Sequence, residues 1–244
     1  MQRIILIETS TALCSAAIAE QGAITAYRES SAPKAHASLT AVFIQEMLQE
    51  RGLTLSDCDA VCVSMGPGSY TGLRVGVSTA KGLCFGAGKP LLAVGTLDTL
   101  AAQALEQIAA TPEDTCNDAK FIIPMIDARR MEVYSAVFEM VSSSAESRCE
   151  VRQITETAPA IIDENSFAEY LDQGKCLFIG DGAGKCADVI KHPNAQFCQC
   201  YPNASAMLDP AIEAYKAERF EDVAYFEPFY LKEFVATVSK KKMW

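Results

Sequence analysis

Short apolar runs alternate with amphipathic stretches through residues 1–110. Apolar runs rich in β-branched residues predict strands, and apolar positions three or four residues apart predict helices. The pattern therefore predicts three opening strands, followed in turn by a helix, a strand, a helix, a strand and a helix. The opening strands are expected at 3–9, 14–19 and 23–28, the helices at 36–51, 72–86 and 96–110, and the later strands at 59–65 and 90–94.

A polar stretch at 111–119 predicts a linker, and beyond it the same order of elements recurs. We therefore expect one lobe at 1–110 and a smaller one at 120–244, which ends in an extended tail. In the second lobe we expect strands at 120–126, 132–140, 149–155 and 176–179, a serine-rich loop at 142–147, a helix at 166–173, a glycine turn at 180–184 and a helical region at 203–220, interrupted at Asp209-Pro210.

Residues 64–76 combine the end of a strand, a tight loop and the start of a helix. Gly66-Pro67-Gly68 is typical of a turn, because glycine freedom flanks a fixed proline φ. Ser69 or Thr71 can cap the helix that follows Tyr70. A Walker loop would end in Gly-Lys-Ser/Thr, whereas Gly72 precedes Leu73-Arg74, so a structural turn is favoured over a phosphate cradle.

The string from Gly66 to Gly76, with Ala80-Lys81-Gly82-Leu83 beyond it, resembles the signature of the TsaB (YeaZ) family. That family supplies a subunit of the bacterial machinery that makes threonylcarbamoyladenosine on tRNA. Further matching pieces span most of the chain: Ile7-Glu8-Thr9-Ser10, the helix opening at His36, Asp127-Ala128-Arg129, Gly180-Asp181-Gly182-Ala183 and Pro228-Phe229-Tyr230-Leu231-Lys232.

The resemblance implies a two-lobed α/β protein of the actin-like ATPase (ASKHA) fold. Each lobe would be a mixed sheet with an antiparallel three-strand start plus helices, and the recurrence of elements favours this fold independently. In that superfamily a phosphate lies between the lobes, against the first hairpin turn of each. The residues that could bind nucleotide weakly here are Glu8, Thr9, Ser10, Asp127 and Arg129. The first turn lacks the usual glycine, however, and for Asp127 a hydrogen bond within its own hairpin turn is favoured over a phosphate contact.

The resemblance also implies a role without catalysis. In the related subunit TsaD, two histidines one turn apart bind the catalytic metal, whereas here Thr40 follows His36 by four residues, and His192 is the only other histidine. We therefore predict no metal site and no required cofactor, and we expect the chain to activate TsaD by forming a heterodimer, with the ATPase TsaE joining. The alternative is a small actin-like kinase or phosphohydrolase that uses Glu8 and Asp127; the histidine count disfavours a metallopeptidase.

Two helices are the candidate surface for TsaD, or for a second copy of the chain in a homodimer. Small residues of the second helix would let a partner helix approach closely, beside an apolar face of the first. Packing inside the chain itself is the alternative. The predicted interface residues are His36, Leu39, Val42, Phe43 and Met47 in the first helix, and Gly72, Leu73, Arg74, Gly76 and Ala80 in the second.

The composition of the 244-residue chain limits its expected location and the ligands that it is expected to bind alone. No apolar run is long enough to span a membrane and no export signal is evident, so we expect a cytoplasmic protein whose ten cysteines are reduced. A formal charge of −10 disfavours independent binding to a polyanion. We therefore expect tRNA to be held mainly by the complex, with the Lys240-Lys241-Lys242 tail a candidate phosphate contact.

Overall fold

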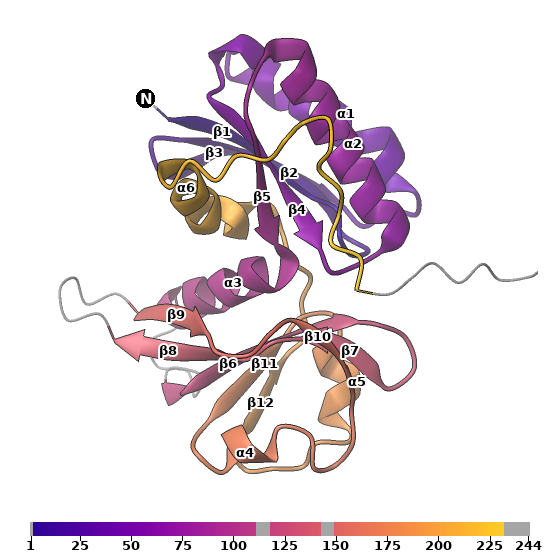
Figure 1. Ribbon diagram of the computed structural model, residues 1–244, viewed down its shortest axis with the longest axis vertical. Helices are drawn as coiled ribbons and strands as arrows, with labels where there is room; N and C mark the ends of the chain where they lie inside the picture. The colour runs from indigo at the N-terminus through magenta and orange to yellow at the C-terminus, as the bar shows by residue number, and fades with distance from the viewer. Residues whose placement is uncertain (1, 111–117, 143–148, 232–244) are drawn as a thin grey trace, which may run out of the picture.

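The first of two sheets contains five strands in the order β3-β2-β1-β4-β5 (Figure 1). The computed structural model describes residues 2–110, 118–142 and 149–231. β1, β2 and β3 are antiparallel neighbours, whereas β4 and β5 are added in parallel through helical crossovers. The strands are β1 (Arg3–Glu8), β2 (Cys14–Glu20), β3 (Ala23–Ser30), β4 (Ala60–Gly66) and β5 (Leu91–Gly95).

Helices cover both faces of this sheet. α1 (Ala35–Glu50) and α2 (Tyr70–Ala87) lie on one face, and α6 (Leu208–Lys216) lies on the other (Figure 1). Alternation along β1 explains the two layers, because Ile5 and Ile7 pack towards α1 and α2 whereas Ile4 and Leu6 pack towards α6. All four side chains are almost completely buried.

The second sheet repeats the core of the first. Its main path is β10-β7-β6-β11-β12, in which β6, β11 and β12 are parallel and β7 is antiparallel to β6. β8 pairs with the opposite end of β6 and with β9. The strands are β6 (Phe121–Asp127), β7 (Glu132–Ser135), β8 (Phe138–Ser142), β9 (Cys149–Gln153), β10 (Ala158–Ile161), β11 (Cys176–Ile179) and β12 (Ala195–Cys198).

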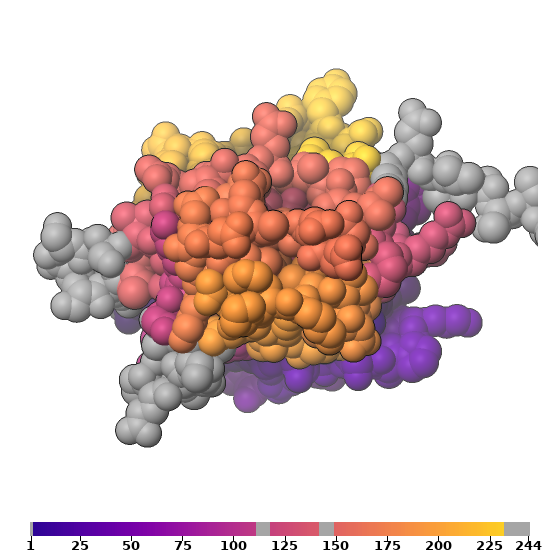
Figure 2. Space-filling model, turned by 90° about the horizontal axis from the view of Figure 1, so that it is seen from below, coloured from indigo at the N-terminus to yellow at the C-terminus, as the bar shows by residue number. Residues whose placement is uncertain are grey.

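α3 (Thr96–Ala110) follows β5 of the first sheet and packs on the second sheet. Its Leu97 and Leu100 belong to the same apolar cluster as residues of β6 and β11. Two short helices, α4 (Ala168–Leu171) and α5 (Ala183–Ala187), belong to the second sheet. Figure 2 looks onto that end of the molecule, where atoms from α4 to β12, in orange, occupy the centre of the face.

The structure confirms the recurrent α/β architecture and corrects several elements. The strand predicted at 132–140 is two strands, because Ser135, Ala136, Val137 and Phe138 are buried consecutively and break the alternation of faces. β10 and β12 were not predicted, and the helix predicted at 166–173 is confined to α4. α2 begins at Tyr70, two residues before the prediction.

The chain returns to the first sheet after β12. Ala204 N–H donates to Ser15 Oγ at 2.9 Å, and Ala211 and Ala214 of α6 pack against the sheet. A short 3-10 turn, η3 (Ser205–Met207), leads directly into α6, which begins one residue before Asp209-Pro210, where the sequence predicted a break or restart of the helix. The sequence had placed 203–220 with the second lobe. In the structure α6 packs on the first sheet instead, because its small apolar side chains fit the face of that sheet opposite α1 and α2.

The boundaries at 110 and 120 stay a prediction. The predicted linker lies mostly at 111–117, outside the described residues, as does most of the predicted serine-rich loop. The tail from 232 onward, with Lys240–Lys242, also lies outside them.

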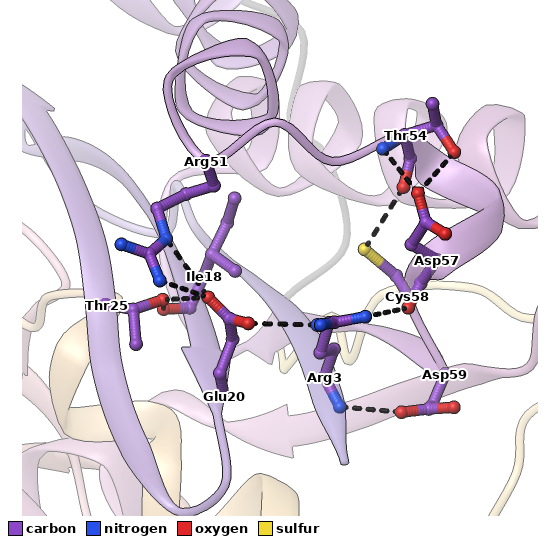
Figure 3. A network of polar contacts seen from close by, with 9 residues as sticks. All are labelled: Arg3, Ile18, Glu20, Thr25, Arg51, Thr54, Asp57, Cys58 and Asp59. Atoms are coloured by element: carbon purple, nitrogen blue, oxygen red, sulfur yellow. Dashed lines mark hydrogen bonds and ion pairs between the residues drawn. The ribbon is translucent and has the colours of Figure 1, made fainter. Parts of the chain in front are cut away.

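A polar network closes the end of the first sheet where β1 begins (Figure 3). The Glu20 carboxylate accepts hydrogen bonds from Arg3 Nε and Thr25 Oγ1, both at 2.9 Å, and pairs with Arg51 at 3.0 Å. The network thus joins β1, β2, β3 and the residue that follows α1.

Within the described residues, no helix is long and apolar enough to cross a membrane.

Candidate functional site

The glycine loop between β4 and α2 is anchored to the turn that follows β1. Gly66 has φ +110°, and the Gly66-Pro67 peptide is cis. Ser69 N–H donates to the Ser10 carbonyl at 2.6 Å, and Ser69 Oγ accepts from Gly72 N–H at 3.3 Å. Ser69 is therefore the N-cap, which is why the helix begins at Tyr70.

The small residues at the start of α2 fit against this chain's own β1–β2 turn. A Cβ added to Gly72 would lie 2.1 Å from the Thr9 carbonyl oxygen, and one added to Gly76 would lie 2.2 Å from Thr9 Oγ1. Gly68 is equally close to Ser10. The glycine stripe that was predicted to receive a partner helix is therefore covered by the β1–β2 turn of this chain. The absence of side chains at these glycines lets the turn approach α2 and the loop before it.

Most other predicted interface residues are also internal. Phe43, Met47, Leu73 and Ala80 are each at most 9% exposed and pack inside the chain. Half-buried His36 places Nε2 2.8 Å from the Thr11 carbonyl oxygen, which fixes the start of α1 to the same turn. Leu39 is partly buried against the core cluster. Of the predicted set, only Val42 and Arg74 are exposed.

A different strip of the same two helices faces outward. Phe85 of α2 is 85% exposed and Val42 of α1 is 40% exposed. Gly82 and Gly86 lie next to Phe85 along α2, and among residues 2–110, 118–142 and 149–231 nothing comes within 4 Å of a Cβ added at either position. We call Val42, Gly82, Phe85 and Gly86 the outer α1–α2 face. The same two helices also line an open groove of about 490 Å³, formed by Ala41, Ile44, Gln45, Leu48, Gln49, Leu53, Leu55 and Leu83.

Glu8 is enclosed in the first turn. The side chain is fully buried, Oε1 accepts from Ser10 N–H at 2.6 Å, and Oε2 has no hydrogen-bond partner among the residues that the structure describes. Burial raises the pKa of this carboxyl above its ordinary value, an effect that hydrogen bonds from Ser10 partly offset. Thr9 and Ser10 are also buried, so this turn presents no open phosphate cradle.

The equivalent turn of the second sheet is held by a lysine. Lys185 forms an ion pair with Asp127 and donates to the carbonyls of Arg130 and Glu132 at 2.9 and 2.7 Å. Arg129 N–H donates to Asp127 Oδ1 at 2.8 Å, which is the local turn that the sequence favoured over a phosphate contact. Asp127 is therefore engaged within its own lobe.

Neighbouring Asp181 completes this second turn. Its Oδ1 accepts from Asp127 N–H at 2.9 Å, and burial raises the pKa of its carboxyl to about 6. Sequence reasoning singled out the glycine turn that contains Asp181, but it missed Lys185, because a lysine in a short helix carries no signal of its target.

Arg74 packs under the C-terminal segment. Its guanidinium lies 4.0 Å from the centre of the Tyr70 ring, and Nε donates to Tyr230 OH at 3.2 Å. Lys81, two turns along α2, donates to the Ala224 and Phe226 carbonyls, both at 3.0 Å. Residues 221–231, the C-terminal strap, therefore run beside α2 (Figure 1).

No group of three or more His, Cys, Asp or Glu side chains suited to a metal occurs within 2–110, 118–142 and 149–231. The described cysteines are free thiols, and six of them are buried.

Two sheets with the same parallel core and antiparallel start, each followed by helices, define an actin-like protein. The model of the family TsaD: tRNA N6-adenosine threonylcarbamoyltransferase matches residues 28–240. The chain is 30% identical over 237 residues to the Escherichia coli protein named tRNA threonylcarbamoyladenosine biosynthesis protein TsaB, and covers 96% of both chains. Its Haemophilus influenzae namesake is 29% identical and covers 94% of this chain and 93% of its own.

A solved structure titled YeaZ from Pseudomonas aeruginosa superposes with a TM-score of 0.79 at 25% identity, covering 95% of this chain and all of the other. The chain thus belongs to the TsaB (YeaZ) family, within the wider TsaD-like group that the family model defines.

Proposed function

We propose that this chain is a non-catalytic subunit of tRNA threonylcarbamoyladenosine biosynthesis, which binds and activates TsaD. Membership of the TsaB family supports the pathway, since the relatives that match nearly the whole chain carry that name. The partner would hold the catalytic metal, transfer the threonylcarbamoyl group and supply most of the tRNA contacts. TsaE would join the assembled complex.

The observation that carries the partner proposal is the outer α1–α2 face. A glycine inside a helix lowers stability by about 1 kcal/mol relative to alanine. Gly72 and Gly76 offset that loss by packing on Thr9, whereas a Cβ at Gly82 or Gly86 would lie more than 4 Å from its neighbours in the part of the chain that the structure describes. Close approach of a partner helix would give these two glycines a corresponding role.

Phe85 adds the apolar centre that a specific interface needs. An aromatic side chain that is 85% exposed is unfavourable on a free surface and contributes strongly when a partner covers it. The groove that the same helices line widens the face towards the roughly 800 Å² per partner that stable interfaces bury. We propose the same face for the homodimer, so that the two pairings exclude each other.

Two features support a role without catalysis. Glu8 is fully buried and bonded to Ser10, and Asp127 is paired with Lys185. Neither carboxylate is therefore free to organise a nucleotide-bound magnesium ion. Any nucleotide would bind weakly, at the interface with TsaD.

The test is light-scattering chromatography of the chain alone and with TsaD from the same genome, with tRNA modification assayed in the same samples. The proposal predicts a homodimer that exchanges into a heterodimer, is inactive alone and is required for modification. A monomer that ignores TsaD would overturn the proposal, and ATP turnover abolished by Asp127→Ala would point to a kinase or phosphohydrolase.

A further inference from the structure

Residues 222–226 of the C-terminal strap form a tight turn. Asp222 Oδ1 accepts from the backbone N–H groups of Ala224 at 2.7 Å and of Tyr225 at 3.1 Å, and the Asp222 carbonyl accepts from Phe226 N–H at 2.8 Å. The two side-chain bonds are typical of an aspartate turn, in which a short carboxylate binds the N–H groups that follow it. The backbone of this turn is therefore fixed by its own hydrogen bonds.

The turn is also fixed to the first lobe. Lys81 of α2 donates from Nζ to the carbonyls of Ala224 and Phe226, which are the residues on either side of Tyr225. Val223 and Phe226 pack against the apolar cluster that contains residues of α1 and α2. Tyr225 has the opposite environment, since 83% of it is exposed. The strap thus presents a solvent-exposed tyrosine on a backbone that is held at both sides.

The turn lies along the same stripe of α2 as Phe85. Lys81 and Phe85 are four residues apart, so they are neighbours on one side of the helix. At 3.6 residues per turn, the exposed arc of α2 runs from Lys81 past Phe85 and Gly82 to Leu83, which lines the groove shared with α1. The strap therefore borders the outer α1–α2 face on the side away from α1, and Figure 1 shows it running beside α2 in yellow.

An exposed aromatic ring on a fixed backbone has the properties of an interface anchor. The backbone loses little freedom when a partner binds, because folding has already ordered it, and a tyrosine ring has only two torsions left to fix. Among the described residues, Phe85 and Tyr225 have the highest exposed fractions of all large apolar side chains, 85% and 83%. Burial of one aromatic side chain covers ~150–250 Å², a small part of the roughly 800 Å² that each partner of a stable interface buries. The surface around Phe85 must therefore extend onto its neighbours.

We propose that the C-terminal strap is part of the surface that binds TsaD, with the Tyr225 ring as an anchor beside Phe85. This inference rests on the proposed function and adds to it a segment that is distant in sequence from α1 and α2. A partner that covers Phe85 and approaches Gly82 closely reaches the strap at Lys81. Asp222 and Lys81 hold the turn in the shape that the partner meets.

The test is the dissociation constant of the complex with TsaD from the same genome, for the full chain and its variants. Tyr225→Ala removes an exposed ring, so it should leave the thermal unfolding temperature unchanged. We expect it to weaken TsaD binding at least tenfold, as truncation of an anchor residue does. Tyr225→Phe keeps the ring and should bind as the parent does. Tyr201→Ala, which removes a partly exposed tyrosine next to α3, is the matched control and should leave the affinity unchanged.

The outcomes separate this inference from the proposed function. Tight binding of TsaD by Tyr225→Ala, with weak binding by a Gly82→Leu variant, would remove the strap from the surface and leave the proposed function standing. If the parent does not bind TsaD at all, both are overturned. Equal losses in Tyr225→Ala and Tyr201→Ala, or in Tyr225→Ala and Tyr225→Phe, would show that the Tyr225 ring is no anchor. A loss confined to the homodimer would overturn the proposal and assign the strap to a second copy of the chain.

Discussion

Asp127 and Lys185 are 58 residues apart in sequence and form an ion pair. The sequence indicated a turn around Asp127 and favoured a local role for its carboxylate over a phosphate contact, but it did not indicate the lysine. Only the fold brings α5 beside that turn and decides the carboxylate's partner. Glu8 is a similar case, since its strand could be predicted but the complete burial of its side chain could not.

Glu20 gives a pH-dependent prediction at the same scale. The hydrogen bond from Arg3 is the main cause that lowers the pKa of Glu20, with Thr25 and Arg51 adding to it. A lowered folded-state pKa stabilises the protein above the ordinary value of 4.5, and this contribution is lost as the pH falls through the folded-state pKa.

Glu20→Gln is therefore expected to lower the free energy of unfolding by about 1 kcal/mol at neutral pH, after allowance for solvent screening. The difference from the parent should vanish below the folded-state pKa. Urea denaturation across a pH series measures it, with Glu164→Gln, which removes an exposed carboxylate on the second-sheet side, as the control. A difference that is constant with pH would contradict the assigned role of the carboxylate.

The helices and strands with strong periodicity were predictable as elements. α3 was predicted with its observed bounds, and α1 to within a residue at each end. Short elements of the second sheet were not, because β10 and β12 have only four residues each and their pairing partners are distant in sequence. The glycines of α2 predicted a close approach of another segment to this helix. They did not show that Gly72 and Gly76 lie on a buried face whereas Gly82 and Gly86 lie on an exposed one.

The two faces of α2 give the next prediction. Gly72→Ala should lower the free energy of unfolding by about 2 to 3 kcal/mol, because its Cβ would lie against the rigid Thr9 carbonyl. Gly82→Ala, in the same helix with open space around it, should instead raise it by about 1 kcal/mol. Chemical denaturation of both variants decides the matter, and equal effects would show that α2 does not pack as described.

For the whole molecule, the actin-like architecture could be predicted from the recurrence of elements, and comparison with known proteins confirms it. The candidate site was predictable only in part. The sequence indicated the pair of helices that carries the proposed face, but the buried face could not be told from the exposed one, because both faces of α2 carry glycine. The return of the chain to the first sheet also escaped prediction, since small residues such as Ala211 and Ala214 suit either layer.

The central claim is that the outer α1–α2 face receives TsaD, and Gly82→Leu tests it most directly. Gly82 has room for a side chain in the free chain, so the variant should fold and unfold at a temperature no lower than the parent's. Asp188→Leu adds the same side chain on the second-sheet side and serves as the control.

The measurement is the dissociation constant of the complex with TsaD from the same genome, for the parent and both variants. If TsaD binds at the outer α1–α2 face, Gly82→Leu weakens binding at least tenfold, or by about 1.4 kcal/mol, while Asp188→Leu leaves it unchanged. A folded Gly82→Leu variant that binds TsaD as tightly as the parent would contradict that placement.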